Sequence, residues 1–174
     1  MSLPAEAPRR LFLALWPDDA LRRRLADLAQ NTAGRRALRP DNLHLTLVFL
    51  GATAAGRLAC YENALADLAV PPLTLTLDRL GYFPRPRILW LGASHVPPAL
   101  YGLVADLNRR LAGCGFALER RPFQPHITLA RRYSGAVPVL AEAVVWSVDQ
   151  VSLMESVASG DGVGYQLLRR WPGG

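Results

Sequence analysis

The sequence contains no lysine, although 20 of its 174 residues are basic. All of these residues are arginines, so mechanisms that use a lysine nucleophile or a lysine Schiff base are excluded. Guanidinium groups suit bidentate contacts with phosphate. With 14 acidic residues the net charge is +6, which favours an anionic partner such as a nucleotide or nucleic acid, although a general bias in composition also explains it.

Cysteines and long apolar runs are also scarce. Cys60 and Cys114 form no CxxC motif and no disulfide framework, so we expect two small buried hydrophobic side chains. The longest apolar run near the start, residues 11–16, is too short for a membrane span or a signal-peptide core. We therefore expect no membrane association and a cytoplasmic location.

What the sequence does contain is a repeated unit of apolar strand, helix, arginine-rich connection and second strand. In the first half, a strand at residues 11–16 and a helix with regularly spaced leucines lead to a strand at residues 42–51. In the second half, a strand at residues 88–93 and a proline-opened helix lead to a strand at residues 125–131. The pattern predicts one domain, residues 1–174, of two pseudo-symmetric lobes with helices packed on sheet, in the α/β or α+β class.

Other segments fill in this plan. Regular apolar spacing predicts a helix over residues 58–68 and a half-buried strand over residues 73–80. Residues 81–87 contain two prolines and are predicted as a turn or loop. Residues 137–145 fit a helix or a strand, and two further strands are predicted near the end of the chain.

Two His-x-Thr-Leu motifs, HLTL at 44–47 and HITL at 126–129, are the candidate chemical groups. Residues i and i+2 of a strand point to the same face, so each histidine shares a face with its threonine. If the halves pack about a pseudo-two-fold axis, the equivalent strands can lie side by side. Two imidazoles and two hydroxyls would then line one groove.

These four groups suit the cleavage of a phosphodiester. One neutral imidazole accepts a proton and one protonated imidazole donates one, because the ordinary histidine pKa of about 6.5 permits both forms near neutrality. The hydroxyls can donate to nonbridging phosphate oxygens. A single such motif is more often structural, but two copies at equivalent places favour chemistry. The third histidine, His95, lies in a loop segment and is expected to face solvent.

A zinc site is the main chemical alternative. Zinc usually takes three or four ligands, with carboxylate or thiolate among them. No Asp, Glu or Cys lies within four residues after either histidine, and Asp41 is off the shared face by strand parity. The sequence therefore predicts no metal at the motifs.

The two motifs, the FLG after the first, the RPFQPHITLAR around the second and the opening RLFLALWP resemble the two-histidine phosphoesterase superfamily. Within it, they are most similar to the RNA 2′,3′-cyclic phosphodiesterase (2′-5′ RNA ligase) family, from about Arg10 to Arg131. The resemblance implies a bilobal α+β fold with antiparallel-rich sheets around a central cleft. It also implies hydrolysis of an RNA 2′,3′-cyclic phosphate to a 2′-phosphate without metal or cofactor, and the related 2′-5′ joining of RNA ends. The expected partner is RNA with such an end, and the expected state is a monomer.

Carried over by position, the resemblance implies that His44 donates a proton to the departing 3′ oxygen and that His126 accepts one from water. Thr46 and Thr128 would hold the phosphate, together with Arg131. Strand parity points Arg131 away from the histidine five positions before it, so it reaches the phosphate only if the strand ends or bulges first.

The substrate class and the roles of two phenylalanines stay open at this stage. The substrate is either RNA or a small cyclic phosphate of a nucleotide or ADP-ribose, and a non-catalytic RNA-binding module would also use the arginines. Phe83 and Phe123 are base-stacking candidates, although packing explains each of them better. The first-half position equivalent to Arg131 is Phe49, which breaks the pseudo-symmetry.

Overall fold

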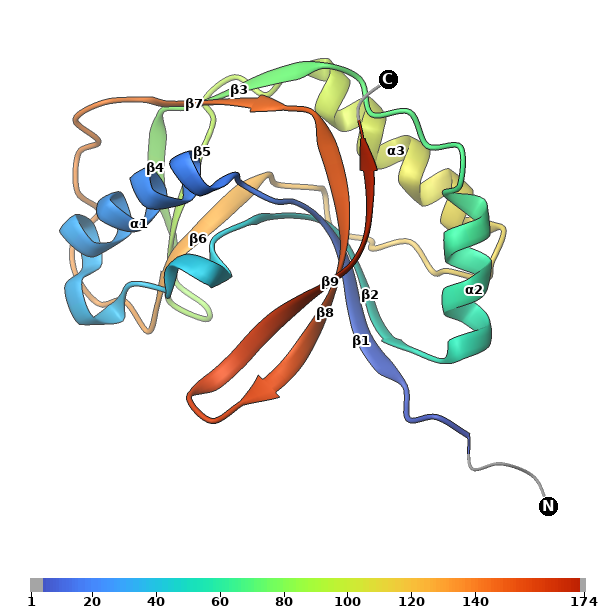
Figure 1. Cartoon of the computed structure of the whole chain (residues 1–174). Coiled ribbons are helices and arrows are strands. Elements are labelled where there is room, and N and C mark those ends of the chain that lie inside the picture. Colours follow the sequence, from blue (N-terminus) through green and yellow to red (C-terminus); the bar gives the residue numbers. More distant parts are fainter. Residues whose placement is uncertain (1–4, 173–174) are drawn as a thin grey trace.

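The structure is a computed structural model that describes residues 5–172 (Figure 1). The strands are β1 (Arg9–Leu15), β2 (Leu45–Thr53), β3 (Leu73–Leu77), β4 (Arg79–Phe83), β5 (Ile88–Gly92), β6 (His126–Arg131), β7 (Val144–Val148), β8 (Gln150–Ser159) and β9 (Gly162–Pro172). The helices are α1 (Asp19–Ala33), α2 (Ala55–Ala64) and α3 (Pro98–Ala112), with 3-10 turns η1 (Gly34–Arg36) and η2 (Pro40–Asn42).

Seven strands form one antiparallel sheet in the order β4-β5-β6-β2-β1-β8-β9, and β3 pairs with β7 in a separate two-stranded sheet. This arrangement confirms the α+β class. The inner strands run β5-β6 and then β2-β1, so the two strand–helix–strand units meet at β2 and β6. The one pair of residues that joins them is Leu45 with Ile127, each of which follows the histidine of its motif. The pseudo-two-fold axis therefore passes between the motifs.

Local sequence signals account for the ends of α1 and for the start of α3. The side chain of Asp18 caps α1 by accepting a hydrogen bond from the Leu21 N–H at 2.8 Å, and Gly34 ends the helix at a φ of 51°. Pro98 opens α3 at its first position, where its missing N–H costs no hydrogen bond. The apolar stripe of α3 is buried at Leu100, Leu103, Val104, Leu107 and Leu111.

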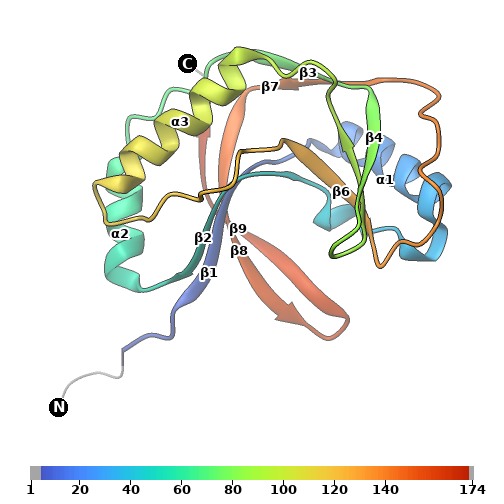
Figure 2. The ribbon, with the colours of Figure 1, turned by 180° about the vertical axis from the view of Figure 1, so that it is seen from behind.

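The two halves are interlocked. Helix α1, from the first half, packs against β6, whereas α3, from the second half, packs against β2 and α2. Figures 1 and 2 show this exchange from opposite sides, with α1 beside β4 and β6 and α3 beside α2. Each half thus supplies the helix that covers the other half's strand.

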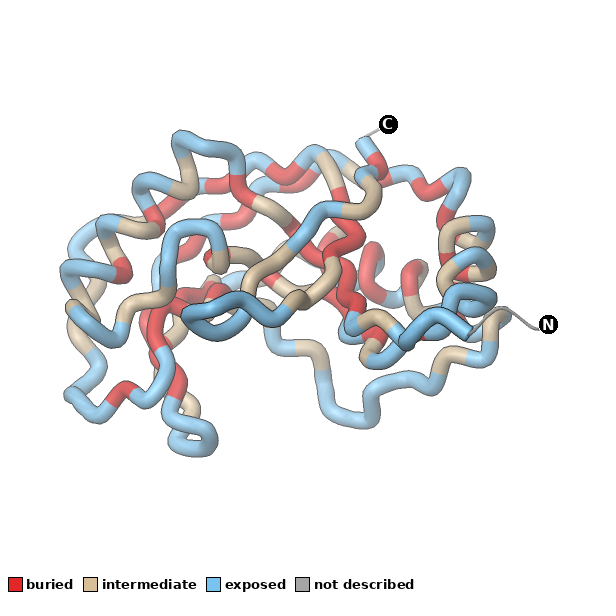
Figure 3. Tube along the Cα trace, turned by 60° about the horizontal axis from the view of Figure 1, so that its bottom comes forward, coloured by how far each residue is buried: buried red, intermediate tan, exposed pale blue. Residues whose placement is uncertain are grey.

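The main core lies along the central strands, as the buried segments in Figure 3 show. Leu45 and Ile127 are both fully buried in it, and burying a side chain of this size contributes about 1.5–3 kcal/mol. The residues that alternate with them face the opposite side of the sheet, where the motif histidines are half-buried. No helix within residues 5–172 is both long and apolar enough to cross a membrane.

Three sequence expectations need correction. The helix predicted over residues 58–68 is α2, which ends at Ala64. The strand predicted over residues 73–80 is two strands, β3 and β4, in different sheets, and β4 extends to Phe83 through residues predicted as loop. Of the ambiguous residues 137–145, only the last two are in a strand, β7.

The expectation for the cysteines is wrong. Cys60 of α2 and Cys114, just after α3, form a disulfide with their Cα atoms 5.9 Å apart. The two residues are 54 positions apart, and only the packing of α2 against α3 brings them together. No short-range motif records such a pair.

Candidate active site

The two motifs lie at the centre of the large sheet. His44 directly precedes β2, and His126 is the first residue of β6. Because Leu45 pairs with Ile127 in antiparallel register, His44 lies across from Thr128 and Thr46 lies across from His126. The structure therefore brings all four motif side chains to one face of two adjacent strands.

A β-bulge follows each histidine at the same distance. In β2, Val48 pairs with Leu13 and Thr46 with Ala14, so Leu47 is the extra residue. In β6, Ala130 and Thr128 pair with consecutive residues of β5, so Leu129 is the extra residue. A bulge of one residue reverses strand parity beyond it. The residue five positions after each histidine thus returns to the histidine face.

The bulge in β6 settles the placement of Arg131. It lies on the same face as His126, and Ala130 is the buried residue instead. Burial is the main cause that lowers the pKa of both motif histidines, and the positive charge of Arg131 contributes to the shift in each. The first-half equivalent, Phe49, is 71% exposed on the same face. The site thus carries a cation at one end and an aromatic ring at the other.

Each imidazole is oriented by the main-chain carbonyl two residues before it. Nδ1 of His44 donates to the Asn42 carbonyl at 2.9 Å, and Nδ1 of His126 donates to the Gln124 carbonyl at 2.7 Å. A carbonyl only accepts hydrogen bonds, so Nδ1 carries the proton and Nε2 is the basic atom of both neutral rings. This pair of contacts was missed by the sequence analysis, because a carbonyl leaves no signal in side-chain identity.

The two Nε2 atoms differ in their contacts. Nε2 of His44 lies 3.0 Å from Oγ1 of Thr46, which donates to it when the ring is neutral. Within residues 5–172, Nε2 of His126 has no hydrogen-bond partner. The lone pair of His126 is therefore free to accept a proton from a substrate or from water.

Aromatic side chains surround His44 on three sides. The indole of Trp16 stacks on its ring at a centroid distance of 5.1 Å and an angle of 12°, and Phe12 lies at 5.0 Å. Tyr165 of β9 meets the ring edge-on at 5.1 Å. These contacts fix the ring plane and exclude water from it. They link three distant segments of the chain, so no local sequence pattern predicts them.

His126 has its own, more open aromatic neighbours. The ring of Phe83 lies edge-on at 5.2 Å and that of Trp90 at 6.4 Å. A Cβ at Gly81 would lie 2.0 Å from the Trp90 ring, so the glycine makes room for the indole. Of the two phenylalanines considered from the sequence, Phe83 lies beside the site, whereas Phe123 packs edge-on with Tyr101.

Burial and charge make both imidazoles weaker bases than free histidine. The pKa of His44 is lowered to about 4, mainly by burial and in smaller part by the charges of Arg131 and His126, while the hydrogen bond to Asn42 opposes the shift. Burial also lowers the pKa of His126, with a smaller contribution from Arg131. Both rings are therefore mainly neutral at pH 7 in the free protein. A bound anion would favour the imidazolium and raise both pKa values.

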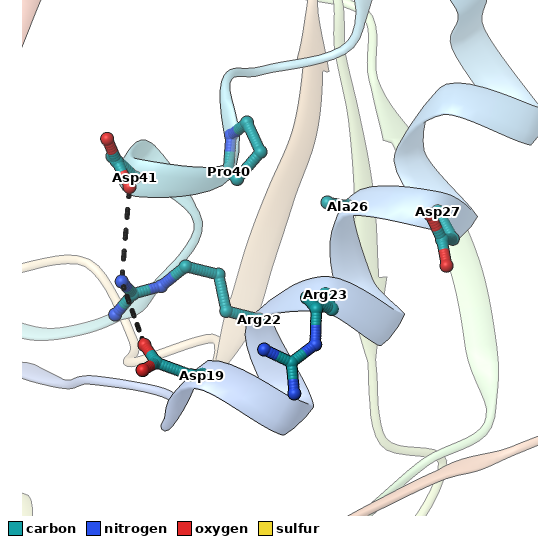
Figure 4. Close-up of a pocket in the computed structure, with 7 residues that line it drawn as sticks. All are labelled: Asp19, Arg22, Arg23, Ala26, Asp27, Pro40 and Asp41. Carbon is teal, nitrogen blue, oxygen red and sulfur yellow. Dashed lines mark ion pairs between the residues drawn. The ribbon is translucent and has the colours of Figure 1, made fainter.

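Other polar groups lie outside this site. His95 is exposed on a loop, as the sequence predicts, near Ser94. A shallow depression of about 430 Å³ lies between α1 and η2 (Figure 4). Its lining combines two arginines with three aspartates, and Arg22 lies 3.8 Å from Asp19 and 3.9 Å from Asp41. Those carboxylates would repel a phosphate, and none of the motif residues lines the depression.

The fold and this pair of matched motifs define a two-histidine phosphoesterase. A sequence model of the family described as LigT like Phosphoesterase matches the chain twice, over residues 15–90 and 91–165. The chain belongs to this family. The double match divides the chain into the same two halves that meet at Leu45 and Ile127.

Individual relatives of this family match almost the whole chain in sequence and in structure. The RNA 2′,3′-cyclic phosphodiesterase of Escherichia coli (strain K12) is 37% identical over 173 residues, which cover 94% of this chain and 96% of the relative. The crystal structure of E. coli LigT in apo form matches with a TM-score of 0.85 at 32% identity, over 96% of this chain and 98% of that one. The E. coli LigT complex with 3′-AMP matches with a TM-score of 0.85 at 33% identity, over 95% and 98%.

Proposed function

We propose that the chain hydrolyses the terminal 2′,3′-cyclic phosphate of RNA to a 2′-phosphate. The single observation that carries the proposal is the pairing of the two motifs on adjacent strands, which brings both histidines to one face with Nδ1 of each held by a carbonyl. Several relatives named RNA 2′,3′-cyclic phosphodiesterase support the choice of substrate. Residues 1–174 act as a single bilobal domain in this proposal, because the helices are exchanged between halves.

The mechanism follows from the different contacts of the two Nε2 atoms, because that of His126 is free and that of His44 contacts Thr46. Nε2 of His126 accepts a proton from water, whose oxygen attacks phosphorus. The bond from phosphorus to the 3′ oxygen breaks, and the imidazolium of His44 donates its proton to that oxygen. The product keeps the phosphate on the 2′ oxygen. In the same direction, with the 5′ hydroxyl of a second RNA in place of water, the attack would break the bond to the 3′ oxygen in the same way and leave a 2′-5′ linkage.

The threonines and Arg131 hold the charge in this mechanism. Thr46 and Thr128 donate hydrogen bonds to nonbridging oxygens, and Arg131 offsets the negative charge that develops on them. When His44 is protonated, its Nε2 no longer accepts a hydrogen bond from Oγ1 of Thr46, which frees the hydroxyl proton for the phosphate. Thr46 thus couples the acid to the substrate.

The test is an assay of purified protein on an oligoribonucleotide with a 2′,3′-cyclic phosphate end, in the presence of EDTA. We expect turnover that EDTA does not reduce, with a 2′-phosphate as product. Within residues 5–172, no group of three or more His, Cys, Asp or Glu side chains is placed to hold a metal ion, which supports the metal-independent form of the proposal. Loss of turnover in EDTA, or a 3′-phosphate product, would refute it.

The pH dependence of the reaction tests the two depressed pKa values. The acceptor must be neutral, so activity falls below its pKa, and the donor must be protonated, so activity falls above its pKa. Because the pKa of His44 is lowered to about 4 and that of His126 is also lowered, kcat/KM should peak on the acid side of about 6.5. The kcat profile should lie at higher pH, because the bound anion favours imidazolium.

Initial rates measured over a pH series, on a substrate whose phosphodiester stays ionised throughout, give both profiles. The exposed His95 supplies the control, since a His95→Ala variant should leave both maxima in place. A kcat/KM maximum on the alkaline side of neutrality would contradict the assignment of these two rings.

A small cyclic nucleotide is the second candidate substrate. It is favoured by the E. coli LigT structure in complex with 3′-AMP, a single nucleotide. Equal kcat/KM on a cyclic mononucleotide and on an oligoribonucleotide with the same end would favour it. A clear gain with the oligoribonucleotide would favour RNA.

We further propose that the protein is monomeric and works in the cytoplasm on processed RNA ends. The interlocked halves complete both motifs within one chain, which supports the monomer. Disulfides are uncommon in cytoplasmic proteins, so in that compartment Cys60 and Cys114 would be mainly reduced thiols.

A further inference from the structure

Three segments that are far apart in the sequence meet at the end of β6. Ala37, just after η1, forms a β-bridge with Ala130, and the Leu38 N–H donates to the Leu129 carbonyl at 2.8 Å. On the other side of β6, Arg131 pairs with the first residue of β5. Figures 1 and 2 both show the turn after α1, the β4–β5 loop and the end of β6 at one corner of the molecule.

This corner collects exposed arginines. The antiparallel pairings set Arg36 beside Arg131 and Arg87 beside Arg132, and the Tyr133 N–H donates to the Arg87 carbonyl at 3.1 Å. We call five of these residues, apart from Arg131 itself, the arginine corner. They are Arg35, Arg36, Arg85, Arg87 and Arg132, and all are exposed.

None of these five guanidinium groups has an ion pair within the described part of the chain. The reason is visible in the sequence, because residues 28–40, 79–105 and 120–141 contain no Asp or Glu. Arginines near carboxylates do form ion pairs, as Arg110 does with Asp67. The positive charge of the corner is therefore uncompensated and available to an external anion.

The backbone at the corner also departs from ordinary geometry. Arg87 and Arg132 have φ values of 66° and 53°, in the left-handed region that residues with a side chain seldom adopt. Such conformations cost about 1–3 kcal/mol each and concentrate at binding and catalytic sites. Here both belong to arginines that lie beside each other at the end of the active-site strand.

The corner adjoins the site, because Arg36 lies beside Arg131 of the site. We propose that the arginine corner binds the sugar-phosphate backbone of the RNA strand on the 5′ side of its cyclic phosphate end. The proposal rests on the proposed function and extends it to the rest of the substrate. Five guanidinium groups from three segments exceed what one phosphate can use, whereas successive phosphates of a strand can each take a bidentate contact. A mononucleotide would not reach them.

The test compares two substrates with the same reacting end, a cyclic mononucleotide and a short oligoribonucleotide, over a series of salt concentrations. An Arg36→Ala/Arg132→Ala double variant should lose about tenfold in kcat/KM on the oligoribonucleotide at low salt. Its salt dependence should weaken, with the slope of log(kcat/KM) against log[salt] less negative by about 0.7 per lost contact. Turnover of the mononucleotide should stay unchanged.

The matched control is an Arg23→Ala/Arg57→Ala double variant, which removes the same charge from exposed positions on α1 and α2 that form no ion pair with residues 5–172. It should behave as the wild type on both substrates. Equal losses by the two double variants would show a general charge effect and overturn the proposal, as would equal losses by the corner variant on both substrates.

A binding arm separates this proposal from the proposed function. Fluorescence anisotropy with a labelled oligoribonucleotide ending in a 2′-phosphate needs no turnover, and the corner variant should bind it about tenfold more weakly than the control. Unchanged affinity overturns the arginine corner even if the enzyme hydrolyses RNA. If the corner variant binds more weakly but the wild-type protein does not hydrolyse the cyclic phosphate, the arginine corner is supported and the proposed reaction is refuted.

Discussion

Replacing His126 by alanine should lower kcat/KM on cyclic-ended RNA by about 10²–10⁴-fold, the usual contribution of one general acid or base. The same loss is expected for His44→Ala. Nδ1 of each ring is held by a carbonyl, so Nε2 is the atom of each ring that transfers a proton. Alanine has no group that could take over this transfer. A variant that lacks both histidines should lose little more than either single variant, because the two groups act as a unit.

The control for this experiment is the third histidine. His95 is exposed outside the site, and a His95→Ala variant should retain wild-type kcat/KM. Thermal unfolding of each variant separates a chemical effect from a folding effect, which matters most for His44, whose ring packs between Trp16, Phe12 and Tyr165. Wild-type activity in the double variant would remove the basis of the mechanism.

The separate roles of the two histidines can be read from the leaving group. A phosphodiester with a nitrophenolate leaving group needs no proton donor, whereas the 3′ oxygen of a ribose does. On the activated ester, the His44→Ala variant should therefore recover most of its loss, and the His126→Ala variant should not. If only the His126→Ala variant recovers activity on the activated ester, His126 is the proton donor and His44 the acceptor. Equal recovery by both variants would contradict separate donor and acceptor roles.

The sequence predicts the site's chemistry better than its shape. Strand parity alone places each histidine with its threonine, and the repeated unit predicts that the two pairs meet. The pairing of Leu45 with Ile127 is a long-range contact, which the repeat makes plausible and only the fold determines. The motifs can be recognised in the sequence because the spacing of histidine and threonine is local. The register between β2 and β6 depends on the packing of the whole sheet.

Arg131 shows where local parity fails. Regular alternation points it away from His126, and one extra residue at Leu129 brings it back. The bulge at Leu47 has the same place in the first half, so both are properties of the repeated unit rather than accidents of one strand. Nothing in the side chains marks a bulge, because leucine fits a buried strand with or without one.

The aromatic neighbours of the two histidines differ in how far the sequence could reveal them. Trp90 alternates with two buried leucines, so parity alone places it on the face of the sheet that carries the motifs. Tyr165 meets His44 only because β9 pairs with β8 and β8 with β1. That contact depends on three strand pairings, none of which is local.

Reduction of the disulfide between Cys60 and Cys114 should lower the free energy of unfolding substantially without changing catalysis. Cross-linking residues 54 positions apart restricts the unfolded chain, and chain-entropy arguments give about 4 kcal/mol for a loop of that length. The disulfide joins α2 to the end of α3, and no motif residue lies on either helix. Stability and activity should therefore respond independently.

Denaturant unfolding of the oxidised and reduced protein measures the difference, with kcat/KM on cyclic-ended RNA measured in parallel. A Cys60→Ser/Cys114→Ser variant is the matched control, since it should unfold at the midpoint of the reduced protein and not respond to reductant. If the protein works in the cytoplasm, the reduced form is the working form, and its remaining stability must rest on the packing of α2 against α3. Equal midpoints for oxidised and reduced protein would contradict the predicted stabilisation by the cross-link.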